Sequence, residues 1–417
     1  METHFQVDVQ SEIGKLEGVI LHTPGSEVEN MTPANAERAL YSDILNLVIA
    51  QKEYSQLRAV LEKLTKVFQV RDLMTDILEM DDARTFLLKD ICSDSRDCHL
   101  QEILGTMQSS ELATLLIEGV PMAKDNLSKF LSPERYELRP LHNFFFTRDS
   151  SMTLGNEVLI GNMANAVRDR ESRIMEAIFR FHPLLNSPII QTSKALNKYG
   201  HINIEGGDIQ IARHDILLSG IGLRTSPGGI DFIIDHYKQQ GKKKSIIVQE
   251  MPHQPESFIH LDMAFTFLNQ HECLVYDPLI LQPNKYQTIR IDLDNGKVKI
   301  RHEKNIVQAL GDLGMDVKPI LCGGQSDQYT QEREQWHSGA NFFTFEPGKS
   351  IGYARNGHTL EELSKHGYEI IQAKDMISGE KHPDSYEKCI VAIDGSELAR
   401  GGGGARCMTM PIKRSKV

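Results

Sequence analysis

The sequence predicts an α/β protein with a helical subdomain inserted into it. Three stretches, at residues 155–179, 214–237 and 348–367, share one order: a turn, an apolar strand, an arginine and then a helical pattern. Between about residues 75 and 135 the pattern is helical throughout. Self-similarity of this kind favours a closed or stacked array of supersecondary units. Three ordinary strand–helix pairs are the alternative.

The elements can be placed in order from hydrophobic periodicity. Residues 16–22 (LEGVILH) predict a first strand, and apolar residues at helical spacing predict a helix over residues 33–64. Residues 68–73 (FQVRDL) predict a short strand, and short amphipathic helices separated by polar turns follow within residues 75–135. After residue 140, strands and hairpins alternate with helices, which is typical of an α/β body.

The composition is that of an ordinary globular protein, and it excludes several classes of partner. The chain has 417 residues, of which 40% are hydrophobic, enough for a buried core. Its net charge of -11 argues against nucleic acid, and the basic run Lys242–Lys244 is interpreted as a solvated helix C-terminus. Apolar runs are too short for a membrane helix, and residues 1–14 do not resemble a secretory signal. We therefore expect a cytoplasmic protein that contacts no membrane. We also expect a homo-oligomer, a dimer or higher.

Cysteine spacing points away from disulfides and zinc. The six cysteines lie at positions 92, 98, 273, 322, 389 and 407, and none forms a CxxC pair. Cys273, Cys322 and Cys389 border strand-like apolar runs, so we expect buried, inert thiols there. Cys407 differs because it follows four consecutive glycines.

Two acidic segments border strand-like runs. HNFFFTRDSSM, at residues 142–152, predicts a buried strand that ends in Arg148 and Asp149. Because neighbouring residues of a strand face opposite sides, these two need not pair, although a structural salt bridge is the alternative. In NIEGGDIQI, two glycines between Glu205 and Asp208 permit a tight turn or a close backbone approach. A hairpin turn with two surface acids is the alternative there.

A histidine and an aspartate lie together in the segment FIHLDMAFTFL. On a strand, His260 and Asp262 would share one face while Leu261 points away. A lone pair of this kind is more often structural than catalytic. Its interpretation therefore depends on the other reactive residues of the chain.

The segment ELARGGGGARCMTMP places a thiol directly after a glycine loop. The glycines predict a mobile loop that permits close backbone approach, and a phosphate-binding loop is excluded because no GKS or GKT follows. MTMPIKR predicts a final strand. A thiol at this junction, beside Arg406, could have a depressed pKa and be reactive. Cys407 is thus the candidate nucleophile.

Together these residues suit the chemistry of a guanidinium group. Cys407 supplies a nucleophile, His260 an acid/base, Glu205 an acid that could orient it, and Asp149 and Asp262 two further carboxylates. A planar guanidinium offers N–H donors that match bidentate carboxylates. Two carboxylates would fix it while the thiolate adds to its carbon. His260 would then protonate the departing ammonia and activate water against a covalent thiouronium.

The motifs FTRD, EGGD, HLD and GGGxxCMTMP, in that order, resemble the arginine deiminase family, as do SEIGKLEGVILHTPG and IGYARNGHT. The resemblance runs from about residue 10 to the C-terminus. It implies a pentein fold: a pseudo-fivefold α/β propeller of ββαβ units, here a single catalytic domain over residues 1–417 with a helical insertion at 75–135. It also implies citrulline and ammonia as products, with no metal or cofactor.

The resemblance further implies a role for each site residue. The catalytic set is Cys407, His260, Glu205, Asp149 and Asp262. The residues that grip the substrate's carboxylate are Asn143, Arg168 and Arg224, the backbone carbonyl of Phe146 meets its α-amine, and Asp208 is a second-shell or turn residue of the substrate site. Free L-arginine is favoured as the substrate because all three residues that grip the carboxylate are retained.

Two positions depart from the family's pattern. The family has an arginine five residues before the cysteine, where this chain has Gly402, so Arg400 or Arg406 could substitute in substrate binding. Residues 41–43 read Tyr-Ser-Asp where the family often has FDD. Three alternatives stay open: an amidinotransferase, an enzyme for another guanidine such as agmatine or methylated or peptide-bound arginine, and a non-catalytic binding protein.

Overall fold

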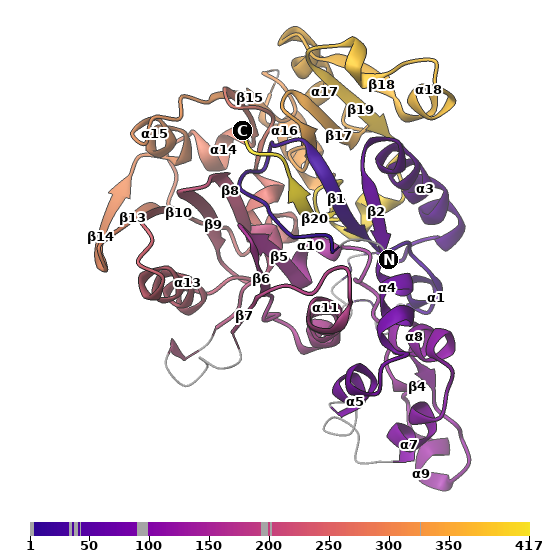
Figure 1. Ribbon diagram of the computed structural model, residues 1–417. Helices are drawn as coiled ribbons and strands as arrows, with labels where there is room; N and C mark the ends of the chain where they lie inside the picture. The colour runs from indigo at the N-terminus through magenta and orange to yellow at the C-terminus, as the bar shows by residue number, and fades with distance from the viewer. Residues whose placement is uncertain are drawn as a thin grey trace.

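The structure is a computed structural model that describes residues 4–32, 36, 41, 43–89, 99–192, 199–200, 202–325 and 327–417 (Figure 1). Ser42, Cys92 and Cys98 lie outside the described residues, as does part of the helix predicted over residues 33–64. The described part of that helix is α3 (Leu47–Leu64), which Asn46 caps by accepting a hydrogen bond from the backbone N–H of Ile49.

Five sheets of the described chain repeat one strand pattern, which confirms an α/β fold. In each, an antiparallel pair is followed by a strand that lies parallel to the second member of the pair. The five sets are β20 (Met410–Arg414), β1 (Leu16–Leu21) and β2 (Lys66–Gln69); β5 (Ser151–Leu154), β6 (Glu157–Ile160) and β7 (Ile189–Gln191); β8 (Ile209–Arg213), β9 (Ile216–Ile221) and β10 (Lys244–Glu250); β11 (Phe265–Phe267), β12 (Glu272–Val275) and β15 (Lys318–Leu321); and β16 (Phe343–Glu346), β17 (Lys349–Tyr353) and β19 (Cys389–Ile393).

Additional strands extend two of these sheets. The third sheet continues through β13 (Thr288–Asp294) and β14 (Lys297–Glu303), and β18 (Glu369–Gln372) borders β19. Because β20 pairs with β1, the first and last strands of the chain belong to one sheet. The final strand predicted from MTMPIKR is thereby confirmed.

Helices connect the parallel strands and lie on the outer side of the sheets (Figure 1). They are α3, α11 (Asp169–Phe181), α13 (Pro227–Gln239), α15 (Ile306–Gly311) and α17 (Gly357–Lys365). Arg168, Arg224 and Arg355 each fall between a strand and the next helix, as the predicted repeat requires.

Helix α11 shows how the repeat positions a site residue. Its buried residues Ile174 and Ile178 are one helical turn apart and pack in the same core cluster as Val158 of β6. Full burial of such a side chain contributes about 1.5–3 kcal/mol, so this face anchors the helix against its sheet. Arg168, the N-cap residue of α11, is consequently held at the edge of the sheet.

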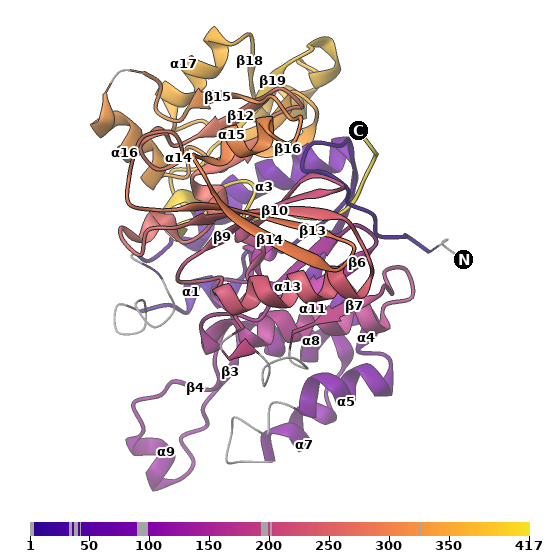
Figure 2. The ribbon, with the colours of Figure 1, turned by 90° about the vertical axis from the view of Figure 1, so that its left-hand side faces the viewer.

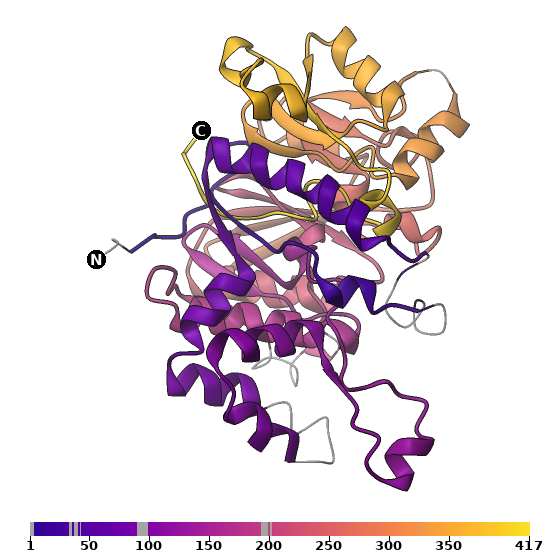
Figure 3. The same ribbon diagram turned by 90° about the vertical axis from the view of Figure 1, so that its right-hand side faces the viewer.

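The helical region begins earlier than the sequence indicates. Strand β2 ends at Gln69, and Val70, which falls within the predicted strand over residues 68–73, starts α4 (Val70–Ile77) because Leu73 and Ile77 continue a buried helical face. The region continues with α5 (Asp81–Lys89), α7 (His99–Gly105), α8 (Ser109–Glu118) and α9 (Leu127–Leu131), and with the short strands β3 (Val120–Pro121) and β4 (Tyr136–Leu138). Figures 2 and 3 show it at one end of the molecule, opposite α17. Among the described helices, none combines the length and the hydrophobicity that a bilayer-spanning segment needs.

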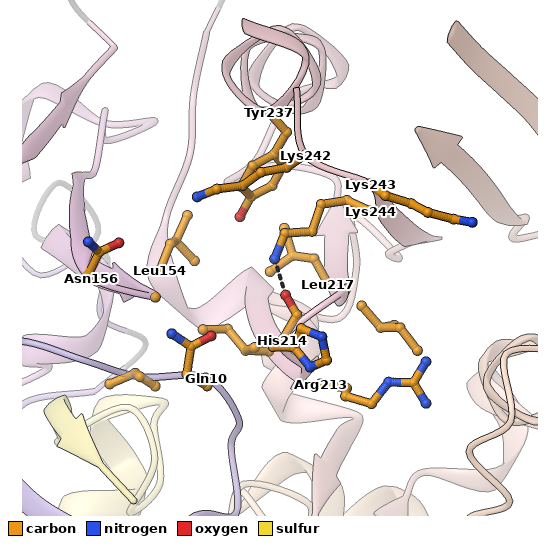
Figure 4. Close-up of a pocket in the computed structure, with 14 residues that line it drawn as sticks. Gln10, Leu154, Asn156, Arg213, His214, Leu217, Tyr237, Lys242, Lys243 and Lys244 are labelled. Carbon is orange, nitrogen blue, oxygen red and sulfur yellow. Dashed lines mark hydrogen bonds between the residues drawn. The ribbon is translucent and has the colours of Figure 1, made fainter. Parts of the chain in front are cut away.

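The basic run borders a cavity of about 300 Å³ beside the β5–β6 and β8–β9 turns. Figure 4 shows Lys242 and Lys244 on one side of it and Gln10 on the other. Helix α13 ends at Gln239, just before the run, and Lys243 is largely exposed. Lys242 lies 3.9 Å from Glu157, and Lys244 donates to the carbonyl of His214. Lys242 and Lys243 are exposed just after the C-terminus of α13, as predicted, but Lys244 begins β10 (Lys244–Glu250), where burial lowers its pKa to about 8, so the predicted solvated helix terminus does not extend to it.

Candidate active site

The predicted catalytic residues occupy corresponding positions in four of the five sheets. Asp149 precedes β5, Glu205 precedes β8, His260 and Asp262 precede β11, and Cys407 precedes β20. All five side chains are buried. The structure therefore brings together residues that lie far apart in the sequence, because each lies just before the first strand of its own sheet.

Two of the local predictions are wrong. The strand predicted to end in Arg148 and Asp149 is instead a series of turns followed by the short helix α10 (Thr147–Ser150). Backbone hydrogen bonds close these turns, from the N–H of Phe144 to the carbonyl of Leu141 at 3.1 Å and from the N–H of Phe146 to the carbonyl of Asn143 at 3.0 Å. Arg148 donates to the carbonyl of Arg406 at 3.2 Å and does not pair with Asp149.

His260 also lies outside any strand. It is the N-cap residue of a 3-10 turn over Leu261–Met263, so the shared strand face predicted for His260 and Asp262 is absent. Asp208 explains the turn: it is buried, and its carboxylate accepts the backbone N–H of Leu261 at 2.9 Å. Burial raises the pKa of Asp208 to about 6. Asp208 thus holds the backbone of the histidine segment in place, and a contact between Asp208 and the substrate stays a prediction.

His260 is held between two carboxylates. Its Nε2 lies 2.9 Å from Oε2 of Glu205, and its Nδ1 lies 3.7 Å from Oδ1 of Asp149. Burial disfavours the imidazolium, but Asp149 and Glu205 outweigh burial and raise the pKa of His260 to about 9. At neutral pH the imidazole is protonated, which is the form that a general acid requires.

Cys407 faces the other aspartate. Its Sγ lies 3.8 and 3.9 Å from the two carboxylate oxygens of Asp262. Burial, followed by the charges of Asp262 and Asp149, raises the pKa of the thiol well above its usual value. The depressed pKa expected from Arg406 is therefore wrong, because the positive charge of Arg406 is already offset by Glu12 and Asp262.

Asn341 is a site residue that the sequence analysis missed. Its side-chain amide donates to Sγ of Cys407 at 3.1 Å, and it is almost fully buried. It precedes β16, the first strand of the remaining sheet, and so occupies the position that corresponds to the predicted residues. That recurrence, visible once the strands are aligned, is the signal that could have found it.

Arg406 does not lie where a substrate-binding arginine would. Its side chain is 2% exposed, and its donors go to Asp262 at 2.8 Å, to Glu12 at 3.2 Å and to the carbonyl of Ile209 at 2.7 Å. Protein groups thus occupy its guanidinium, which corrects the expectation that Arg406 binds substrate. The structure assigns it to holding Asp262 in place.

Arg400 lies at the protein surface, which we call the rim of the site, apart from the buried cluster of catalytic candidates. Its side chain is 38% exposed and contacts Asp43 at 2.5 Å and Glu397 at 3.0 Å. Position 402, where the family has arginine, has a φ of +84°. Glycine adopts this left-handed conformation without strain, unlike arginine. The loop backbone therefore accounts for Gly402, and Arg400 remains a candidate for the substrate contact.

Gly403 and Gly404 of the loop are packed in the interior. A Cβ on Gly403 would lie 2.5 Å from the Phe146 ring, and one on Gly404 would lie 2.6 Å from the Asn341 side-chain oxygen. Both glycines are buried. They thus serve the close backbone approach that the sequence predicted.

Arg168 and Arg224 differ in how far the protein satisfies them. The guanidinium of Arg168 binds Asp149 at 2.8 Å and Glu171 at 2.8 Å, and it is fully engaged. Arg224 lies 3.6 Å from Glu205, is 13% exposed, and its Nη1 has no hydrogen-bond partner among the described residues. Arg224 is therefore the better placed of the two for a substrate carboxylate.

Asn143 and Phe146 lie on the turn before α10. Both are buried, and the backbone N–H of Phe146 donates to the carbonyl of Asn143 at 3.0 Å. The Phe146 carbonyl accepts the backbone N–H of Asp149 at 3.4 Å. A contact between this carbonyl and an α-amine stays a prediction, as does the role of Asn143.

One group of described residues has the geometry of a cation site. The potential ligand atoms of Asp149, Glu205 and His260 lie within 4.8 Å of one another. Arg168 already contacts two of them, at 2.8 Å from Asp149 and 3.7 Å from Glu205. Its guanidinium supplies the positive charge that this group would otherwise require.

Solved structures share this fold over almost the whole chain. The amidinotransferase SxtG from Microseira wollei has a TM-score of 0.56 at 13% identity and covers 99% of this chain and 98% of its own. The substrate-bound N-terminal domain of ArgZ, an arginine dihydrolase from Cyanobacteria, has a TM-score of 0.53 at 13% identity, over 95% and 98%. A citrulline complex of DDAH from Pseudomonas aeruginosa has a TM-score of 0.50 at 14% identity, over 95% and 99%. The chain thus has the α/β fold of these pentein enzymes.

The family model for arginine deiminase matches residues 37–414 of the chain. This protein belongs to the arginine deiminase family, as the order of its motifs predicted.

Proposed function

We propose that the protein hydrolyses the guanidinium of L-arginine to give L-citrulline and ammonia, with Cys407 as nucleophile. One observation carries the proposal: a buried thiol, two aspartates and a His–Glu pair gather from four separate sheets. Membership of the arginine deiminase family supports the same reaction. Binding alone would not require a thiol and a protonated imidazole in one cluster.

In this proposal the substrate guanidinium lies between Asp149 and Asp262. Its positive charge offsets the two carboxylates that, together with burial, hold the pKa of Cys407 high, so the thiol releases its proton to solvent when the substrate binds. Sγ then adds to the guanidinium carbon. Protonated His260 gives its proton to the departing nitrogen, ammonia leaves, and a thiouronium remains on Cys407.

Water completes the reaction. It attacks the same carbon while His260, now neutral, accepts a proton from it. The C–S bond then breaks, which restores the thiolate of Cys407, and the remaining hydroxyl proton passes to solvent as the carbonyl of citrulline forms. Glu205 keeps the imidazole in place throughout, since its carboxylate accepts the hydrogen bond from Nε2.

The substrate's carboxylate is assigned to Arg224, because its guanidinium is only partly satisfied by the protein. Arg168 is assigned to orienting Asp149. We further propose that the five sheets close into a pseudo-fivefold propeller in one catalytic domain, with the helices from α4 to α9 as an insertion. The free thiol would require a reducing compartment such as the cytoplasm.

The decisive experiment incubates the purified protein with L-arginine and measures citrulline and ammonia, with Cys407→Ala as the control. We expect both products from the wild type and neither from the variant. Turnover of agmatine or a methylarginine, without turnover of arginine, would reject the substrate and keep the chemistry. Transfer of the amidino group to added glycine or ornithine would identify an amidinotransferase. Equal rates for Cys407→Ala and wild type would reject the mechanism.

A further inference from the structure

We infer that Asn341 is a catalytic residue: its side-chain amide donates to Sγ of Cys407, stabilises the thiolate and fixes the direction of attack. This inference rests on the proposed function of Cys407 as nucleophile. Asn341 touches the reacting atom itself, at 3.1 Å from Nδ2 to Sγ. It lies outside the motifs FTRD, EGGD, HLD and GGGxxCMTMP, which carry the family resemblance.

The orientation of the Asn341 amide follows from its other hydrogen bonds. The side-chain oxygen accepts the backbone N–H of Arg406 at 2.9 Å and that of Cys407 at 3.2 Å. An oxygen must occupy that side, because only an oxygen can accept two N–H groups. The NH₂ group is consequently directed at Sγ and at the backbone carbonyl of Asp262, 3.2 Å away.

Asn341 occupies the same position in its sheet as the predicted catalytic residues do in theirs. Asp149, Glu205, His260 and Cys407 each precede the first strand of a sheet, and Asn341 precedes β16 in the fifth. With it, all five sheets contribute a side chain to the cluster.

The glycine loop is shaped around this asparagine. A Cβ at Gly404 would lie 2.6 Å from the side-chain oxygen of Asn341 and 2.8 Å from both its Cβ and its backbone oxygen. Glycine is thus needed at position 404 for the loop to approach Asn341. The loop and the amide together determine where Sγ sits.

Charge explains why the sulfur needs a donor. Burial and the two aspartates disfavour the thiolate, and the thiol can share its proton with Asp262. Once that proton leaves, the sulfur carries a negative charge beside carboxylates. A buried N–H donor then stabilises the charged form more than the neutral one, as donors to developing anions do in other active sites.

The test is Asn341→Asp, which keeps an oxygen for the two backbone N–H groups but removes the donor to sulfur. We expect kcat for arginine to fall about 100-fold, as for loss of one donor to a developing anion, with little change in KM. The rate of Cys407 alkylation by iodoacetamide, localised by mass spectrometry, should shift its pH midpoint upward by about one unit. Asn356→Asp is the matched control, because Asn356 is equally buried and donates to the His337 carbonyl, away from Cys407.

Asn341→Ala separates charge from the missing donor. It should also slow alkylation at a given pH, by a smaller factor than Asn341→Asp. Thermal unfolding of each variant checks that it is folded. If both folded variants keep the wild-type alkylation profile, the inference is overturned. Because alkylation needs no arginine, that outcome is distinct from failure of the proposed function, in which the wild type releases no product from a guanidine substrate.

Discussion

Two arginines at either end of the glycine loop form ion pairs in opposite environments. Arg406 pairs with Asp262 and Glu12 in the interior, where its side chain is 2% exposed. Arg400 pairs with Asp43 and Glu397 at the rim, where its side chain is 38% exposed. They are six positions apart in sequence, and both were candidates for the same substrate contact.

The difference teaches that burial decides what such an arginine can do. A buried charge keeps its protein partners because leaving any of them unpaired would cost free energy. Arg406 therefore cannot exchange its carboxylates for a ligand. An exposed ion pair contributes little and can exchange partners with a ligand. Arg224, at 13% exposure and with an unsatisfied Nη1, lies between the two. The predictions below test this ranking.

The largest effect is expected for Arg406→Met. The substitution removes the guanidinium that forms an ion pair with both buried Glu12 and buried Asp262, so the free energy of unfolding should fall by about 3–5 kcal/mol. Arginine turnover should fall as well, because Asp262 loses the contact that orients it beside Cys407. Urea denaturation measures the first effect, and citrulline release by the folded fraction measures the second.

The double variant Glu12→Gln, Arg406→Met provides the control. Removing the charge of Glu12 should restore part of the lost stability, because burial raises the pKa of this carboxyl and it is Arg406, with Arg148 and Arg414, that lowers it to about 2. If Arg406→Met unfolds at the wild-type urea concentration, the buried ion pair has no structural role and the comparison fails.

The raised pKa of His260, in the same buried cluster, predicts that the stability of the protein depends on pH. The pKa of this histidine is raised from 6.5 to about 9 in the folded protein, so the folded state binds the proton more tightly than the unfolded state. The resulting stabilisation is fully present below about pH 6.5 and is lost as pH rises through about 9, a change on the order of 3 kcal/mol. The free energy of unfolding should decline more steeply over this window in the wild type than in His260→Gln. Parallel curves for the two proteins would contradict it.

The strand–arginine–helix repeat was predictable because local hydrophobic periodicity determines it. The strand, arginine and helix around Arg168 and Arg224 follow one another within a few residues, so hydrophobic spacing is enough to find them. The order of the chemical motifs likewise pointed to the family. The turn before Asp149 was missed because three successive phenylalanines are typical of a buried strand, whereas here backbone hydrogen bonds from Phe144 to Leu141 and from Phe146 to Asn143 close turns.

The remainder of the site depends on contacts between distant segments. Glu12, Asn341 and Arg406 meet only after the first and last strands pair and five sheets are in place. No local pattern marks Glu12 as the partner of Arg406. The pKa of Cys407 was mispredicted for the same reason: the adjacent arginine was visible in the sequence, and the carboxylates that neutralise it were not.

Arg224→Ala should have an intermediate effect, confined to substrates that carry a carboxylate. Loss of a charge-assisted contact of this kind costs about 1–3 kcal/mol, so KM for arginine should rise roughly 10- to 100-fold. Agmatine has the guanidinium but no carboxylate, and any turnover of it should be unchanged. Steady-state kinetics with both compounds makes the comparison, and an equal loss with both would place Arg224 with the groups that support Glu205.

The smallest effect is expected for Arg400→Ala. An exposed pair contributes between 0 and about 1 kcal/mol to stability, so the urea midpoint should hardly move, and less at high salt. KM distinguishes the two roles still open to Arg400. If Asp43 and Glu397 are its only partners, KM for arginine should stay within about twofold of the wild type, as for loss of a solvent-exposed pair. The family has a substrate-binding arginine where this chain has Gly402. If Arg400 takes over that contact, KM for arginine should rise about tenfold or more, and KM for agmatine should not. That result would show that a rim arginine can leave its carboxylate for a substrate, which the buried Arg406 cannot do.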